Sequence, residues 1–310
     1  MGFDVSHLSR SSSAFFASII AFLSNLLSRS PRTPDTKDQP ASEVSQISPS
    51  DKNNAADAKD ATAAATVTEG TGTSTPEEEP TKSLTAAEAF DSVGPAYEDA
   101  FKGLPTQAAA IDWLVDHLKE NKVEKGKIVD VGCGTGRPAC SVLADAGHDV
   151  LGIDISEAML TAARERVPNA RFELVDVRPF IERETAAGKQ GTLDAVTVFF
   201  SLIAGVTQDD IRAVLAGLAG LLKPGGFLVF STVPIPVNNA AIKWMGRPVV
   251  VSSLSPEEGV AAVKAAGLDV KYDAVTKFTP KGADAGICAA DEVWEESHLF
   301  VYAQKPAATA

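Results

Sequence analysis

Residues 130–137 read DVGCGTGR. The stretch begins at the end of a short β-branched run at 127–131 and leads into a segment of helical character that starts at about Arg137. Glycine at every second position lets the backbone fold tightly between strand and helix, and it leaves no Cβ to hold a ligand away. The dinucleotide fingerprint needs a glycine at position 137, where this chain has Arg. An acid at Asp130, two residues before the first glycine, suits a ligand with an ammonium group better than a pyrophosphate. The stretch therefore predicts a ligand at a strand–turn–helix unit.

Apolar strands and helical segments alternate after this unit. Strands are predicted at 149–153, 171–175, 193–200 and 227–232, and helices at about 156–166, with Ser156 as N-cap, and at about 208–222 and 256–266. Strands spaced by helices of about ten to fifteen residues predict a parallel sheet covered on both faces. Ligands of such sheets bind at the carboxyl ends of the strands, so chemistry is expected there.

Two acidic residues stand where predicted strands end. Asp154 lies eighteen residues beyond Gly136 and ends the second strand. A carboxylate there can accept from both hydroxyls of a ribose, and Ile155 beside it can pack on a purine face. Asp176 follows the third strand, where it can accept from an exocyclic amine. These positions indicate a site for a nucleoside-containing ligand.

Four segments together resemble the class I S-adenosylmethionine-dependent methyltransferases, in particular the small-molecule group with a generic methyltransferase domain. The segments are IVDVGCGTG at 128–136, GIDIS at 152–156, DV at 176–177 and LLKPGG at 221–226. The resemblance covers about residues 91–305. It implies an α/β fold with a doubly wound, seven-stranded, Rossmann-like sheet whose last strand is antiparallel, and the stretches 269–275 and 298–303 fit the two final strands.

The same resemblance implies S-adenosyl-L-methionine as the cofactor and assigns its contacts by position. The methionine part would contact Asp130, Gly132, Gly134, Thr135 and Gly136, the ribose Asp154, and the adenine Ile155, Asp176 and Val177. The faces of Phe199 and Phe200 would flank the sulfonium. Tyr97 matches a region that often closes over the cofactor as an N-terminal lid.

The acceptor of the methyl group is expected to be a small molecule, with an O, N or S atom as the nucleophile. Related enzymes often place a His shortly after the fourth strand, but residues 201–205 are SLIAG, so no base is assigned there. The absence of an N-P-P-Y motif at that point disfavours DNA and glutamine side chains as acceptors. Acceptor contacts are expected from the N-terminal region near Tyr97, from 234–254 and from 277–297, with His298 or Glu295 as the polar catalytic group.

Two other functions compete with methyl transfer. A nicotinamide-dependent Rossmann oxidoreductase is disfavoured by Arg137, and a cofactor-binding but non-catalytic methyltransferase-like protein stays open. No pair of His residues has the spacing of metal ligands, so no metal is predicted. The cysteines Cys133, Cys140 and Cys288 form neither a disulfide framework nor a CxxC site, which favours a reducing compartment.

The charge and composition change along the chain. The 310 residues carry a net charge of −13, which argues against a nucleic-acid partner because such surfaces need clustered Lys and Arg. Residues 1–90 hold 7 basic and 12 acidic side chains, and the rest hold 21 and 29. We predict an amphipathic or hydrophobic segment at 1–29, a disordered linker at 30–85, where few large apolar side chains occur, and the methyltransferase domain at 86–310.

The uncharged run at 11–28 has three interpretations. Its large apolar residues fall on one broad face of a helical wheel, and at about 18 residues it is at the short limit for a membrane span. It can be a membrane anchor, an organelle-targeting presequence or a helix without a targeting function. A cytoplasmic location is predicted for the catalytic domain, with membrane anchoring or organelle targeting as the alternatives, and the oligomeric state is left open.

Overall fold

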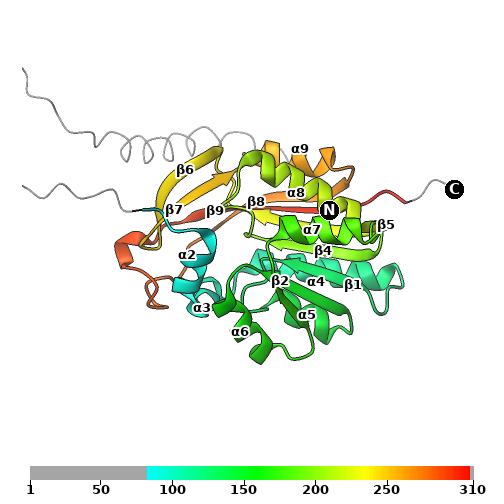
Figure 1. Ribbon diagram of the computed structural model, residues 1–310, viewed down its shortest axis with the longest axis horizontal. Helices are drawn as coiled ribbons and strands as arrows, with labels where there is room; N and C mark the ends of the chain where they lie inside the picture. The colour runs from blue at the N-terminus through cyan, green and yellow to red at the C-terminus, as the bar shows by residue number, and fades with distance from the viewer. Residues whose placement is uncertain (1–81, 308–310) are drawn as a thin grey trace, which may run out of the picture. The chain divides into compact units, whose positions relative to one another are not determined.

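A seven-stranded sheet runs through residues 82–307, the part of the chain that the computed structural model describes (Figure 1). In spatial order its strands are β3 (Arg171–Leu174), β2 (Asp149–Asp154), β1 (Lys127–Val131), β4 (Leu193–Phe199), β5 (Leu222–Thr232), β9 (Glu296–Gln304) and β8 (Asp269–Phe278). Neighbouring strands from β3 to β5 pair in parallel, whereas β9 pairs antiparallel with both β5 and β8. The predicted sheet with an antiparallel last strand is confirmed.

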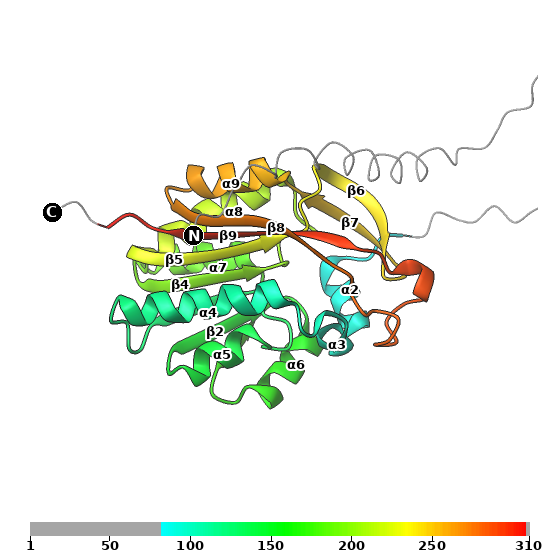
Figure 2. The same cartoon turned by 180° about the vertical axis from the view of Figure 1, so that it is seen from behind.

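Helices cover both faces of the sheet (Figures 1 and 2). One face carries α4 (Pro105–Glu120), α5 (Ala139–Asp145) and α6 (Glu157–Arg166), and the other carries α7 (Val177–Ala186), α8 (Gln208–Leu221) and α9 (Pro256–Ala265). Alternation along β1 divides the core: Val129 and Val131 pack with α7, α8 and α9, while Ile128 packs with α4 and α5. Asp130 therefore faces the α4–α5 side.

Caps fix where several of these helices begin. The predicted N-cap Ser156 is confirmed, because its Oγ accepts from the backbone N–H of Met159 at 3.2 Å. Capping boxes begin α8 at Thr207 and Asp210 and α9 at Ser255 and Glu258. These caps set the strand-to-helix turns at the edge of the sheet where ligands are expected.

Elements that the sequence did not predict cover the carboxyl ends of the strands. They are the helices α2 (Ala86–Val93) and α3 (Ala96–Phe101), the hairpin of β6 (Val237–Trp244) and β7 (Arg247–Ser253), and a short 3-10 helix, η1 (Ala290–Glu292). The chain before α2 joins the hairpin, since Leu84 N–H donates to the Pro248 carbonyl at 2.7 Å. Ala89, Val249 and Val251 form a small core between α2 and β7, so the two elements act as one cover.

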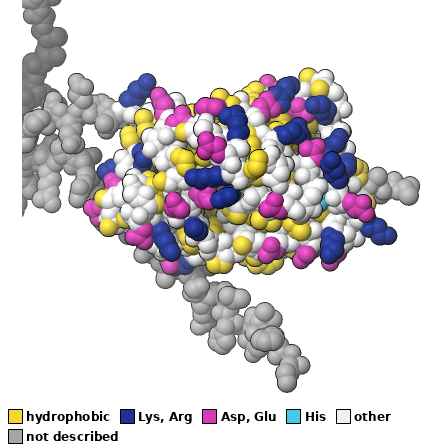
Figure 3. Space-filling view, turned by 90° about the horizontal axis from the view of Figure 1, so that it is seen from below, with side chains coloured by type: hydrophobic (Ala, Val, Ile, Leu, Met, Phe, Trp, Pro, Cys, Tyr) yellow, Lys and Arg dark blue, Asp and Glu magenta, His cyan; other side chains and the backbone are white. Residues whose placement is uncertain are grey.

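The N-terminal predictions fall almost entirely outside the described residues. The segment 1–29, including the run at 11–28, lies outside them, and so does the linker 30–85 up to residue 81. Among the helices of residues 82–307, none has the length and apolar character needed to cross a bilayer. The face shown in Figure 3 intersperses Lys and Arg with Asp and Glu.

Candidate functional site

The glycine-rich turn after β1 needs its glycines for two different reasons. Gly132, Gly134 and Gly136 all have a positive φ, at 66°, 53° and 76°. A Cβ on Gly132 would lie 2.1 Å from the Cβ of Ser201, and one on Gly136 would lie 3.1 Å from side-chain atoms of Phe172. A Cβ on Gly134 would meet no heavy atom within 4 Å. Gly132 and Gly136 are thus required by packing, while Gly134 borders open space.

A cavity of about 560 Å³ lies at the carboxyl ends of β1, β2, β3 and β4. We call it the cofactor cavity. Its volume is within the range of about 300–1,000 Å³ that small-molecule sites occupy. The predicted cofactor residues that line it are Tyr97, Gly132, Gly134, Asp154, Ile155, Asp176, Val177, Phe199 and Phe200. The structure therefore brings these nine positions together around one space, and their individual roles stay predictions.

Asp154 joins the two motifs that meet at this cavity. Its Oδ2 accepts from the backbone N–H of Gly134 at 2.8 Å, and its Oδ1 accepts from that of Ser156 at 2.9 Å. Burial raises the pKa of Asp154, and the backbone donors partly offset this rise. A carboxylate oxygen has two lone pairs, so each oxygen retains one that can accept from a ligand hydroxyl.

Asp130 lies on the other side of the glycine turn and lines a second cavity of about 340 Å³. Its oxygens accept from Thr197 Oγ1 at 2.6 Å and from Cys140 Sγ at 3.3 Å. Burial raises the pKa of Asp130 to about 6, although both hydrogen bonds act in the opposite direction. A cationic group in this cavity would favour the charged carboxylate, which agrees with the predicted contact to an amino group.

Thr135 attaches the helices α2 and α3, which we call the N-terminal cover, to the glycine turn through Glu98 of α3. Its Oγ1 donates to Glu98 Oε2 at 2.8 Å, and the same oxygen accepts from Arg166 of α6. Glu98 therefore connects α3 to both the turn and α6. Glu98 could not be predicted from sequence patterns, because its two partners are 37 and 68 residues away. Gly136 lines neither the cofactor cavity nor the cavity beside Asp130.

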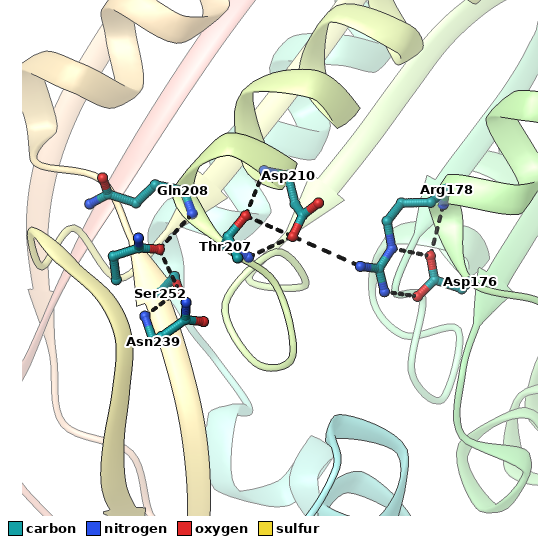
Figure 4. Close-up of polar contacts among 8 residues, drawn as sticks. Asp176, Arg178, Thr207, Gln208, Asp210, Asn239 and Ser252 are labelled. Carbon is teal, nitrogen blue, oxygen red and sulfur yellow. Dashed lines mark hydrogen bonds and ion pairs between the residues drawn. The ribbon is translucent and has the colours of Figure 1, made fainter.

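Asp176 is held by an arginine at the rim of the cofactor cavity (Figure 4). Its carboxylate is the N-cap of α7 and binds Arg178 through both oxygens, at 3.0 and 2.8 Å. The side-chain bonds to Arg178 hold the pKa of Asp176 below its usual value. Arg178 also lies 3.9 Å from Asp210, whose other partner is Thr207. A predicted adenine contact thus has to share the carboxylate with Arg178.

A third cavity, of about 110 Å³, lies between the N-terminal cover and the β6–β7 hairpin. We call it the apolar cavity, because among its lining side chains only Tyr97, Ser253 and Glu296 carry a polar group; Trp244 and Trp294 add an indole N–H each. It shares Phe90, Tyr97, Phe200 and Ala204 with the cofactor cavity. The two spaces are therefore neighbours, separated by a wall of mainly aromatic side chains.

Tyr97 and Phe200 both belong to the wall between the two cavities. Tyr97 packs against Phe90 and Trp244, with ring centroids 5.7 and 6.2 Å apart. Burial raises the pKa of Tyr97, and the negative charges of Glu296 and Asp154 add to this rise. Phe200 has a φ of 55°, a strained conformation for a bulky residue of the kind that gathers at functional sites.

The two predicted catalytic residues lie elsewhere than expected. Glu295 is exposed, pairs with Lys277 at 2.6 Å and lines none of the three cavities. His298 is fully buried and is absent from the same three linings, but its Nε2 contacts Glu296 Oε2 at 3.1 Å. Side chains alternate along a strand, so residues 296 and 298 of β9 share a face that residue 295 does not. Of the two neighbouring acids, Glu296 lines the apolar cavity and Glu295 does not, and the catalytic roles of His298 and Glu295 stay predictions.

Comparisons with known proteins agree with this geometry. A family described as "Methyltransferase domain" matches residues 128–226. The chain is 30% identical over 182 residues to a ubiquinone biosynthesis O-methyltransferase of Thiobacillus denitrificans, which covers 52% of this chain and 75% of that protein. It is 31% identical over 162 residues to a dTDP-3-amino-3,4,6-trideoxy-alpha-D-glucopyranose N,N-dimethyltransferase of Streptomyces venezuelae, covering 50% of this chain and 65% of that one.

A solved structure of magnesium protoporphyrin IX methyltransferase from Synechocystis is also similar, at 17% identity and a TM-score of 0.47, covering 68% of this chain and 92% of that one. The sheet order, the glycine turn, the family match and the sequence relatives define an α/β methyltransferase domain. The chain belongs to the class I S-adenosylmethionine-dependent methyltransferases. Its methyl donor is S-adenosylmethionine, which decides against the nicotinamide-dependent alternative. Within residues 82–307, no group of three His, Cys, Asp or Glu side chains is placed to hold a metal ion.

Proposed function

We propose that this enzyme holds S-adenosylmethionine in the cofactor cavity and transfers its methyl group to a small-molecule acceptor through an O, N or S atom. One observation carries the proposal: the cofactor cavity combines the buried carboxylate of Asp154 at one end with the aromatic ends of β4 at the other. The names of the relatives describe an O-methyltransferase and a sugar N,N-dimethyltransferase, which supports a small acceptor and leaves its atom open.

The residues present fit the cofactor. The open space beside Gly134 admits a ligand against the backbone, and Asp154 offers lone pairs for the two ribose hydroxyls. Ile155 and Val177 give apolar walls for adenine, and Asp130 gives a negative charge for the amino group. When bound, S-adenosylmethionine supplies an electrophilic methyl group on a positively charged sulfur. With the ribose, the adenine and the amino group placed in this way, the reacting centre lies at the end of the cofactor cavity near Phe200.

The protein's part in the reaction is to align and to exclude water. The leaving group departs neutral, so holding the nucleophile at near-attack distance can supply much of the acceleration. Phe199 and Phe200 can present ring faces to the sulfonium. Tyr97 and Phe90, from the N-terminal cover, close the cavity on the side where the acceptor would enter. Removing water from the nucleophile favours transfer further.

We further propose that nucleic acids are not acceptors. Residues 82–307 hold 22 basic and 30 acidic side chains, and the two signs are interspersed on the face of Figure 3. A phosphate-binding surface needs clustered Lys and Arg instead. The cytoplasmic location of the catalytic domain and a membrane contact through residues 11–28 stay predictions.

The test has two stages. In thermal unfolding, S-adenosylhomocysteine at a hundred times its Kd should stabilise the chain by about 2.7 kcal/mol, while NADH should have no effect. The protein is then incubated with methyl-labelled cofactor and a small-molecule extract, and the labelled product is identified. Label in a small molecule supports the proposal. Label on a protein band would contradict the acceptor class, and binding without any transfer would favour the non-catalytic alternative.

A further inference from the structure

Building on the methyl transfer proposed above, we propose that the apolar cavity binds a ring-sized, uncharged portion of a hydroxyl-bearing acceptor, and that Glu296 removes the hydroxyl proton as the methyl group is transferred. His298 is the positioning residue for Glu296. The substrates of the enzyme are then aromatic or alicyclic alcohols, and Glu296 is its catalytic carboxylate.

The size and lining of the apolar cavity favour one ring. Its volume is about 110 Å³, and an apolar protein cavity of about 150 Å³ holds benzene. Rings surround it on several sides: Phe90, Tyr97, Phe101, Phe200, Trp244 and Trp294 all line it. Aromatic side chains bind other rings by offset or edge contacts that add about 0.5–1.5 kcal/mol to area burial. A charged or strongly hydrated acceptor portion would lose its water here without replacement.

Glu296 is the one carboxylate among the residues that line the apolar cavity. Its side chain is 8% exposed, and leaving a carboxylate in such an apolar place is costly unless a partner compensates it. The position is also next to the reacting end of the cofactor cavity, because Tyr97 and Phe200 line both spaces. A carboxylate at this place can reach the polar atom of a molecule whose ring fills the cavity.

His298 supplies the compensating partner. It is 0% exposed, with the rings of Phe200 and Phe278 centred 4.5 and 5.9 Å from its own. Its Nδ1 has no hydrogen-bond partner among the described residues, so we assign the ring proton to Nε2, which then donates to Glu296 Oε2 at 3.1 Å. This bond orients the carboxylate toward the apolar cavity. The remaining lone pairs of Glu296 are left for a substrate.

A hydroxyl acceptor needs this arrangement more than other nucleophiles do. An alcohol or phenol must lose its proton on transfer, whereas an amine or thiol can react without a general base. In the proposed step a lone pair of the acceptor oxygen forms the bond to the methyl carbon, and the electron pair of the carbon–sulfur bond goes to sulfur. The O–H bond breaks, and its proton goes to Glu296. The products are a methyl ether, a neutral thioether and a protonated carboxyl, so atoms and charge balance.

The experiment compares two phenols that differ in whether a base is needed. The full chain is incubated with S-adenosylmethionine and, separately, phenol, para-nitrophenol, aniline or thiophenol. Phenol should be methylated on oxygen, and Glu296→Gln should lower its kcat about 100-fold, within the range of general-base contributions. At about pH 8.5 para-nitrophenol is mostly ionised and phenol is not, so at that pH the rate with para-nitrophenol should change less than about threefold. Glu295→Gln, the same substitution one residue earlier on the surface, is the matched comparison and should change neither.

His298 is tested by paired substitutions. His298→Gln keeps an N–H that can donate to Glu296, and His298→Phe does not. If His298 positions the carboxylate, the Phe variant should lose kcat for phenol as Glu296→Gln does, the Gln variant should recover most of it, and KM should stay within about threefold in both. An equal loss for the two phenols would show a structural role only and would contradict positioning.

Binding is measured independently of turnover. In calorimetry, phenol should bind the complex with S-adenosylhomocysteine, and Ile242→Trp, which fills the apolar cavity from β6, should weaken phenol about tenfold without changing affinity for S-adenosylhomocysteine. If no compound of the panel binds or is methylated, or if aniline is the substrate and Glu296→Gln leaves it unaffected, the inference is wrong. Failure of S-adenosylhomocysteine itself to bind would instead overturn the proposed function.

Discussion

The cofactor cavity and the apolar cavity share a wall but are built in different ways. In the cofactor cavity, the ligand-facing groups sit at the ends of paired strands, and backbone N–H groups of Gly134 and Ser156 hold Asp154. The apolar cavity is assembled from side chains of α2, α3, the β6–β7 hairpin and the start of β9, which are far apart in the sequence. Donor binding thus depends on main-chain geometry, and acceptor binding on replaceable side chains.

This difference predicts separable effects of mutation. A change at the glycine turn or at Asp154 should alter the affinity for S-adenosylhomocysteine, because it alters the main-chain frame. A change in the hairpin or the N-terminal cover should alter the acceptor and spare the donor. The substitutions below test that separation, beginning with the one that should have the largest effect.

Gly132→Ala should have the largest effect. The added Cβ would lie 2.1 Å from Ser201 Cβ, and φ is 66°, so the turn and the end of β4 must both move. We expect a loss of about 4 kcal/mol or more in the free energy of unfolding, or no folded protein. Urea unfolding followed by circular dichroism measures it.

Gly134→Ala is the matched control for the glycine turn. Its φ is 53°, but its Cβ would meet no atom within 4 Å, so only the cost of a left-handed alanine, about 1–2 kcal/mol, is expected. Affinity for S-adenosylhomocysteine should still fall, since the methyl group enters the cofactor cavity. Equal destabilisation by the two variants would show that close contact with Ser201 is not what requires Gly132.

The sequence predicted the sheet because parallel strands and their turns are local patterns. The strand at 127–131, the Ser156 cap and the antiparallel last strand are all observed. Two helices that flank the sheet, α4 and α7, were not predicted. α7 begins directly at Val177, which had been interpreted only as an adenine contact, and its start depends on the side chain of Asp176. The hairpin at 237–253 was missed because its strands are partly exposed and obtain their pattern by packing against α2.

The same distinction applies to the site. Nine of the twelve predicted cofactor positions line one cavity, and all of these except Tyr97 lie at or just after a strand end, where the topology places them. Glu296 was missed and Glu295 chosen, because the register of β9 against β8 decides which of two adjacent acids faces inward. The sequence shows only two polar residues at i and i+2. It predicts neither the pairing of Phe278 with Glu296 nor the contact between Glu296 and His298.

Asp154→Asn should have the next largest effect, on donor affinity. The amide has one acceptor oxygen in place of two, so it cannot satisfy both Gly134 and Ser156 and also accept from two ribose hydroxyls. Each hydrogen bond to a charged group contributes about 1.5–3 kcal/mol, so we expect affinity for S-adenosylhomocysteine to fall about 100-fold. Calorimetry measures the change.

The pH dependence of the same binding gives a second check on Asp154. Burial raises the pKa of Asp154, and a protonated carboxyl accepts fewer hydrogen bonds, so wild-type affinity should fall as pH is lowered through the acid range. The Asn variant should lack this part of the dependence. A variant that binds as tightly as the wild type would remove Asp154 from the ribose site.

Asp130→Asn should change stability in a pH-dependent way. The pKa of Asp130 is about 6 in the folded chain, above the ordinary value of about 4, so its contribution to stability is full below about pH 4 and is lost as pH rises through 6. Relative to the Asn variant, the wild type should lose about 3 kcal/mol between pH 4 and 8. Urea unfolding of both proteins across this range measures the difference between their free energies of unfolding. Titrating groups that the two proteins share contribute equally and cancel in this difference.

Binding should separate the two roles of Asp130. If its carboxylate faces the amino group of the cofactor, Asp130→Asn should bind S-adenosylhomocysteine about tenfold more weakly than the wild type at pH 8. A stability difference that does not vary with pH would mean that burial leaves the carboxyl unperturbed. Unchanged binding would place the amino group elsewhere.

Trp244→Leu, a change in the lining of the apolar cavity, tests whether donor affinity is independent of that cavity. Trp244 packs on Phe90 with ring centroids 5.5 Å apart, and the smaller side chain should lower the free energy of unfolding by about 1–2 kcal/mol. Affinity for S-adenosylhomocysteine should stay within about twofold, because Trp244 does not line the cofactor cavity. A tenfold loss of donor affinity would show that the two cavities are coupled.

Asp176 and Arg178 should give the smallest effects on stability. Their side chains are 32% and 43% exposed, and an ion pair of this kind contributes about 1 kcal/mol or less. The informative quantity is therefore selectivity between S-adenosylhomocysteine and S-inosylhomocysteine, in which a carbonyl replaces the exocyclic amine.

If Asp176 accepts from that amine, the wild type should prefer the adenine form, and Asp176→Asn should reduce the preference about fivefold, equal to about 1 kcal/mol. Arg178→Gln should retain or increase the preference, because it releases lone pairs of Asp176 that the guanidinium now occupies. If Asp176 serves only as the cap of α7, both variants should lower stability slightly while the ratio of the two affinities stays constant. The ratio thus distinguishes a group that contacts the base from one that only begins a helix beside it.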